Sequence, residues 1–195
     1  MAAGQKMFYG AKSKIPESAA LVFHGVIWDV YQWNVKMFDG SDGTFEGLRM
    51  KPVVKIVAVS GDKLFITRER TPADDMRYSL FGGLMEEGEE PLDAAKRELL
   101  EEGGMEADGW EFLTSLDMSG LRRVDSITYL FLAKNCSKVA DQSLDPGEEL
   151  HVEEVDFDTA MQKLGSDSNM VGGATKLLFK DPTWIGALKE KVTKS

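Results

Sequence analysis

The sequence contains very little cysteine and histidine. Cys136 is the single cysteine, and His24 and His151 are the two histidines among 195 residues. One cysteine can form neither an internal disulfide framework nor a thiolate-rich zinc site, and it favours a reducing compartment such as the cytoplasm. Two histidines so far apart in the sequence give little support to a histidine metal site. We interpret all three residues as structural.

Long apolar runs and an excess of positive charge are missing as well. No uninterrupted apolar stretch approaches the ~20 residues that span a bilayer, and the N-terminal segment lacks the apolar run of a secretory signal. The formal net charge is -10, whereas proteins that bind nucleic acid polymers carry clustered Lys and Arg. We therefore expect a cytoplasmic protein with no membrane or nucleic acid polymer as partner, and any nucleotide that it binds is expected to be small.

The chain is long enough for one domain with an N-terminal addition. Residues 1–18 are small, polar and unpatterned, so they predict a mobile arm. Residues 19–50 combine apolar and aromatic strand patterns with a Gly- and Asp-rich turn, which predicts a β-hairpin element. Residues 51–195 hold the remaining pattern and form the predicted main domain.

Strand and helix patterns alternate along that domain. Apolar or alternating runs predict strands over 52–59, 63–67, 127–133 and 151–157, with a polar loop over 68–78. A helix is expected from Pro91 to Gly103–Gly104. Asp158 is expected to cap a helix over 159–164, and Pro182 to separate helices over 174–180 and 183–192. Such interleaving predicts a mixed α/β or α+β sandwich, with helices covering a central sheet.

Three glutamates lie on one face of the helix that begins at Pro91. Glu98, Glu101 and Glu102 are spaced i, i+3 and i+4, which places their Cβ atoms about 5–6 Å apart. Their like charges repel, and hard divalent cations such as Mg²⁺ or Mn²⁺ relieve that repulsion because they prefer oxygen ligands. The alternative is a solvated Glu-rich helix. The opposite stripe is apolar and should pack on the core: Leu92, Ala95 and Leu99.

The residues around these glutamates follow a longer pattern. It reads Gly, five residues, Glu, seven residues, Arg-Glu, an aliphatic residue, any residue, Glu-Glu, any residue, Gly and an aliphatic residue. A chance match in a chain of this length is on the order of one in a million. Through this pattern the chain resembles the Nudix hydrolase family. The matching residues are Gly83, Glu89, Arg97, Glu98, Leu99, Glu101, Glu102, Gly104 and Met105.

The resemblance implies a Nudix-type α/β/α sandwich with a mixed central sheet and an N-terminal β-hairpin extension. It also implies a metal site for Mg²⁺, or Mn²⁺, formed by Glu98, Glu101, Glu102 and the carbonyl of Gly82. Glu89 and Arg97 resemble the pair that tethers the loop to the helix; the alternative is a plain surface ion pair. Glu101, Glu102 and Arg97 are the expected catalytic residues. The general base is left open among four candidates: Glu102, Asp125, Glu148 and Glu149.

The order and spacing of segments over residues 20–180 resemble the ADP-ribose and nucleoside diphosphate sugar pyrophosphatase branch. This branch implies Mg-dependent hydrolysis of a diphosphate linkage to a nucleoside monophosphate and a sugar phosphate. It also implies a homodimer joined through the N-terminal strands. Aromatic residues of those strands could stack on the base or simply pack, and arginines near the site could clamp a phosphate or remain solvated. These residues are Trp28, Tyr31, Trp33, Arg68, Arg70, Arg77, Arg122 and Arg123.

Two other functions remain open from the sequence. One is a nucleoside triphosphate pyrophosphatase that removes damaged nucleotides. The other is a non-catalytic nucleotide-binding module, because a fold can persist without turnover.

Overall fold

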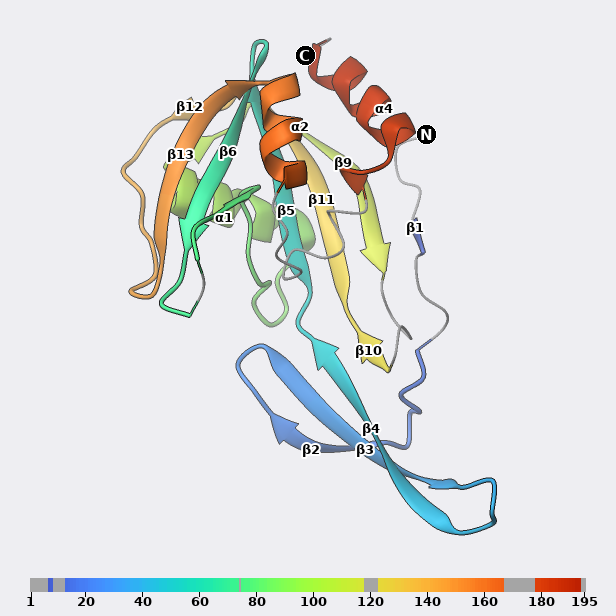
Figure 1. The fold of residues 1–195 in the computed structure, drawn as a ribbon. Helices are drawn as coiled ribbons and strands as arrows, with labels where there is room; N and C mark the ends of the chain where they lie inside the picture. The colour runs from blue at the N-terminus through green and yellow to red at the C-terminus, as the bar shows by residue number, and fades with distance from the viewer. Residues whose placement is uncertain (1–6, 9–12, 74, 118–122, 167–177, 194–195) are drawn as a thin grey trace.

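The computed structural model describes residues 7–8, 13–73, 75–117, 123–166 and 178–193. A mixed seven-stranded sheet forms its centre (Figure 1). β5 and β11 lie side by side in parallel, and β6 and β9 run antiparallel to them on either side. The strands in order are β1 (Met7–Phe8), β9 (Gly109–Asp117), β11 (Ile127–Lys134), β5 (Val53–Ser60), β6 (Lys63–Arg70) and β13 (Glu149–Asp156), and β7 (Arg77–Ser79) pairs with β6.

Helices cover both faces of this sheet because β5 is apolar on both sides. Helix α1 (Pro91–Gly103) packs on the face that carries Ile56 and Ala58. Helices α2 (Phe157–Ser166) and α4 (Pro182–Thr193) pack on the opposite face, around Val57 and Val59. The three layers confirm the predicted α/β/α sandwich with a mixed central sheet (Figure 1). Among the described residues, no helix is long and apolar enough to cross a membrane.

A second sheet projects from the body of the molecule (Figure 1). It corresponds to the predicted element over residues 19–50, and one further strand from residues 124–125 completes it. The strands in order are β10 (Val124–Asp125), β4 (Asp42–Met50), β3 (Trp28–Lys36) and β2 (Ala20–His24). A short ladder of β8 (Met105–Glu106) and β12 (Ser137–Lys138) follows the C-terminal end of α1.

Parts of the predicted N-terminal arm contact the folded domain. Met7–Phe8 pairs in parallel with β9, and Ile15 is buried. The Ser13 hydroxyl donates a hydrogen bond of 2.6 Å to the Asp125 carboxylate. The arm is thus attached to the central sheet through backbone pairing with β9 and to the projecting sheet through Asp125.

The predicted boundaries of several elements change in the structure. Arg68 and Arg70 belong to β6 and Arg77 to β7, so the predicted polar loop is shorter than residues 68–78. Helix α2 starts at Phe157, which is buried, and its cap is Asp156 rather than Asp158. The Asp156 carboxylate accepts a hydrogen bond of 2.9 Å from the backbone N–H of Thr159. Most of the helix predicted over 174–180 lies outside the described residues.

Candidate active site

Helix α1 has the limits that its end residues predict. Pro91 occupies its first turn, and Gly104 follows its end in a left-handed conformation with φ of 61°. The backbone N–H of Gly104 donates a 2.8 Å hydrogen bond to the Leu100 carbonyl. A Cβ atom at Gly104 would lie 2.1 Å from the carbonyl oxygen of Ala140, so glycine is required there for space as well as conformation.

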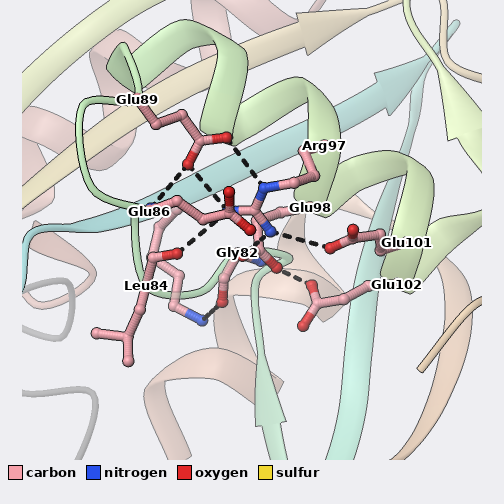
Figure 2. A network of polar contacts seen from close by, with 9 residues as sticks. Gly82, Leu84, Glu86, Glu89, Arg97, Glu98, Glu101 and Glu102 are labelled. Atoms are coloured by element: carbon pink, nitrogen blue, oxygen red, sulfur yellow. Dashed lines mark hydrogen bonds and ion pairs between the residues drawn. The ribbon is translucent and has the colours of Figure 1, made fainter. Parts of the chain in front are cut away.

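Two glycines bring backbone against the acidic face of α1. Gly82 has φ of 128°, and its N–H donates a 2.7 Å hydrogen bond to Oε2 of Glu102 (Figure 2). A Cβ atom at Gly83 would lie 2.6 Å from Oε1 of Glu98. The absence of side chains here allows both carboxylates to lie directly against the chain that precedes the helix.

Arg97 is the centre of the polar network in Figure 2. Its Nε and one terminal nitrogen donate to the two oxygens of Glu89 over 3.0 and 3.1 Å. The same guanidinium donates to the Leu84 carbonyl over 3.1 Å and to Glu98 and Glu101 over 2.9 Å each. The structure thus brings Glu89 and Arg97 together as a bidentate, half-buried pair that joins the loop to the helix. The Arg97 hydrogen bonds lower the pKa of Glu89.

The acidic face of α1 is poorly solvated. Glu98 is 8% exposed and Glu102 is 7% exposed, whereas the side chain of Glu101 is 43% exposed. Burial raises the pKa of Glu98, although Arg97 opposes the rise. Burial also raises the pKa of Glu102 to about 8, against the charge of Lys55 and the hydrogen bond from Gly82. A buried carboxylate with so few compensating partners is a group that a cation stabilises.

The oxygen donors of this face fit a hard divalent cation in type but are not gathered around one point. Among the residues that the structure describes, no three His, Cys, Asp or Glu side chains form a metal-ligand cluster. Glu98 and Glu101 are turned toward Arg97, and Glu102 toward the N–H of Gly82. The predicted ligands share one wall of the site, and a divalent ion bound by all of them would require the carboxylates to leave their present partners.

Lys55 is a site residue that the sequence analysis does not identify. It lies on β5, and its ammonium donates hydrogen bonds of 2.8 Å to the Gly82 carbonyl, 3.1 Å to the Leu80 carbonyl and 3.2 Å to the Ser79 hydroxyl. The carbonyl expected as a metal ligand therefore contacts a lysine. No signal marks this residue in the sequence, because its place depends on the pairing of β5 with the segment at 80–83.

A cavity of about 600 Å³ contains this acidic face. Its lining includes Lys55 and the three helix glutamates. Of the other predicted site residues, it includes Arg70, Arg77, Glu148 and Glu149. Arg70 binds Glu149 over 2.5 Å, and Arg77 binds Glu69, a further lining residue not predicted, over 3.1 Å.

The loop that leads to Glu148 and to Glu149, the first residue of β13, is fixed to the end of α1. The Ser143 N–H donates to the Glu101 carbonyl over 2.8 Å, and the Gln142 amide donates to the Glu102 carbonyl over 2.5 Å. Carbonyl groups at the C-terminal end of a helix have no partners within it, so these contacts satisfy them.

Other predicted site residues lie elsewhere in the chain. Arg68 is exposed on β6 and does not line the cavity. Trp28, Tyr31 and Trp33 are on β3 of the projecting sheet, where Trp33 packs on Phe45 with ring centroids 6.3 Å apart. Larger hollows along that sheet contain no residue of the signature. Arg122 lies outside the described residues.

Asp125 does not line this cavity. It is 6% exposed, accepts a hydrogen bond from Ser13 and lies 3.6 Å from the Arg49 guanidinium. Within one chain it is therefore not placed to act as the general base, because strand β10 carries it to the projecting sheet.

The buried Glu102 predicts a pH-dependent stability of the metal-free protein. Its folded pKa of about 8 exceeds the ordinary 4.5, so between these values the folded state retains a proton that the unfolded chain has released. The contribution of Glu102 to stability is therefore greatest at acidic pH and falls as the pH rises through this window. Glu102→Gln should flatten the change in melting temperature from about pH 5 to 8, measured with a chelator present. Equal slopes for the two proteins would contradict the assignment.

The chain is similar to a known protein family, to two relatives and to a solved structure. A family model described as NUDIX domain matches residues 49–170. The chain is 30% identical over 145 residues to the methanol dehydrogenase activator of Bacillus methanolicus, covering 72% of this chain and 77% of the relative. It is also 30% identical over 149 residues to the ADP-ribose pyrophosphatase of Bacillus subtilis (strain 168), covering 74% and 80%. A crystal structure of an ADP compounds hydrolase shares the fold, with a TM-score of 0.68 and 22% identity over 92% of this chain and 97% of that one.

Proposed function

The chain belongs to the Nudix hydrolase family, and we propose that it hydrolyses the diphosphate linkage of ADP-ribose or a nucleoside diphosphate sugar with Mg²⁺ as its metal. The products are a nucleoside monophosphate and a sugar phosphate. The relative from Bacillus subtilis supports this substrate class by its name. Mn²⁺ is the expected substitute for Mg²⁺, because the donors are all hard oxygen atoms.

The observation that carries the proposal is the composition of the 600 Å³ cavity. Its lining combines the glutamate face of α1 with three guanidinium groups: that of Arg97, which is bound to Glu98 and Glu101, and those of Arg70 and Arg77. A diphosphate carries negative charge on both phosphoryl groups. Its binding site therefore requires metal cations and guanidinium groups, which donate paired hydrogen bonds, around one cavity. A cavity of this kind supplies ligands for the metal as well as the guanidinium groups.

Each group of residues has a distinct task in the proposed reaction. Glu98, Glu101 and Glu102 would hold a divalent ion, which neutralises charge on the diphosphate when bound. Arg70 and Arg77 bind phosphoryl oxygens after exchanging their present carboxylate partners for the substrate. The proton of the attacking water passes to one of three carboxylates in the cavity, which are Glu102, Glu148 and Glu149.

The substrate class is tested with three compounds and Mg²⁺. Incubation with ADP-ribose, GDP-mannose and dGTP is followed by chromatographic detection of nucleoside monophosphates. We expect AMP from ADP-ribose or GMP from GDP-mannose, and little product from dGTP. Turnover of dGTP alone would instead identify a nucleoside triphosphate pyrophosphatase. No turnover of any compound would favour a nucleotide-binding module without activity.

We also propose that the protein is a cytoplasmic homodimer joined through the projecting sheet. The loop between β2 and β3 exposes apolar side chains, among them Val26 at 82% and Ile27 at 45% exposure. Ile27 also lines the active-site cavity, which brings this surface next to the substrate. Association of two copies would cover these side chains and could bring Trp28 of one chain toward the site of the other.

Val26→Asp is expected to convert the dimer to a monomer, because burial of an unpaired charge opposes association. Sedimentation velocity at micromolar concentration measures the change. The control is Val139→Asp, an exposed position (53%) outside the projecting sheet, which should leave the mass unchanged. A monomeric unmodified protein, or a dimer in the Val26 variant, would contradict this interface.

A further inference from the structure

Lys55 contacts the backbone group that the signature reserves for a metal. Its ammonium lies 2.8 Å from the Gly82 carbonyl oxygen, and two more acceptors, the Leu80 carbonyl and the Ser79 hydroxyl, complete its donor capacity. An ammonium has three N–H donors, so this half-buried lysine is fully engaged at one point of the cavity wall.

The same cation acts on the buried carboxylates. The charge of Lys55 lowers the pKa of both Glu98 and Glu102, in opposition to burial. A single residue links Lys55 to Glu102. The Gly82 carbonyl accepts a hydrogen bond from Lys55, and the Gly82 N–H donates one to Glu102. With Arg97 bound to Glu98 and Glu101, two protein cations balance the acidic face.

We propose that Lys55 is the internal counter-ion of the metal-free site, and that a divalent ion entering the site displaces its ammonium from the Gly82 carbonyl. Two cations on one carbonyl oxygen would repel each other strongly, so occupancy by lysine and by metal are alternatives. Lys55 therefore stabilises the site without metal and weakens metal affinity. This inference rests on the metal site of the proposed function.

The first test is metal binding without substrate. Mn²⁺ is titrated calorimetrically into the unmodified protein, Lys55→Met and the control Lys138→Met, whose lysine is exposed on β12. Methionine keeps most of the length of the side chain and removes its charge. We expect Lys55→Met to bind Mn²⁺ at least about tenfold more tightly, since one repelling charge is gone, and Lys138→Met to match the unmodified protein. Equal or weaker binding by Lys55→Met would overturn the inference.

The outcomes also separate this inference from the proposed function. Binding by the unmodified protein with no gain in Lys55→Met refutes the counter-ion role alone. Binding by Lys55→Met but not by the unmodified protein supports displacement, because the lysine then excludes the metal from the site. Absence of binding in all three proteins refutes both the metal site and the exchange.

A second measurement avoids any substitution. Acetylation of lysines by a water-soluble reagent is followed by peptide mass spectrometry with a chelator or with saturating Mg²⁺. The ammonium of Lys55 is held by three acceptors in the metal-free protein, so its modification should be slow and should accelerate several-fold when Mg²⁺ displaces it. An unchanged rate at Lys55, with Lys138 as internal reference, would overturn the exchange.

Discussion

Replacing Glu102 by Gln is expected to lower the rate of diphosphate hydrolysis by roughly 10³-fold or more. Glutamine has the same shape and retains an oxygen that can accept the hydrogen bond from the Gly82 N–H, so the fold should persist. What is lost is a carboxyl group that can be deprotonated, and both cation binding and proton transfer depend on its carboxylate form. Initial rates with ADP-ribose and Mg²⁺ measure the effect, and circular dichroism reports the fold.

Glu106→Gln is the matched control for this variant. Glu106 follows α1 on β8 and is exposed, so its replacement should leave the rate within about twofold, as surface substitutions usually do. An unchanged rate in Glu102→Gln would remove Glu102 from the mechanism.

Gly82→Ala should be the most destabilising single change near the site. A Cβ atom there would lie 2.1 Å from the carbonyl oxygen of Val54 in the central sheet, and φ is 128°. The forced backbone shift and the unfavourable conformation together should lower the free energy of unfolding by about 3–5 kcal/mol. Urea denaturation measures this value.

Gly88→Ala separates the two causes of that loss. Gly88 also has a positive φ, 79°, but a Cβ atom there would meet nothing within 4 Å. Its replacement should therefore lower stability by only about 1–2 kcal/mol, the share that conformation alone accounts for. Similar losses in both variants would show that contact with β5 is unimportant.

Helix α1 and the central strands β5 and β11 could be predicted because each has a local cause in the sequence. Proline at the start, glycine in a left-handed turn at the end and an apolar stripe toward the sheet define the helix. The largely apolar runs of β5 and β11 reflect burial on both faces. The contact of Glu89 with Arg97 follows the same logic, since both residues belong to one continuous segment.

Strand β9 shows where local patterns fail. Its pairing with β11 shifts register between Leu130 and Phe131. Phe112 accordingly packs with the cluster under α1, whereas Leu116, which would share its face in a regular strand, packs with the opposite cluster. Such a bulge breaks the two-residue period by which a strand is identified, and the sequence analysis assigns no element to residues 109–117.

The rest of the site depends on contacts between distant segments. Lys55 and Glu69 enter the cavity because β5 and β6 are neighbours in the sheet, and nothing in their own surroundings in the sequence indicates chemistry. The opposite error occurs at Asp125, an acidic residue in a suitable interval whose strand joins the projecting sheet. Motif spacing indicates which helix carries the reaction, whereas sheet register decides which side chains face it.

The attachment of residues 142–143 to the end of α1 has a kinetic consequence. Because the Ser143 amide is bonded to the Glu101 carbonyl, the loop around Ser143 cannot move away from the end of α1 unless that bond opens. Hydrogen–deuterium exchange at Ser143 therefore reports directly on this opening. Slow exchange throughout turnover would mean that the loop around Ser143 stays attached to α1. Substrate would then enter, and product leave, without any widening of the cavity on this side.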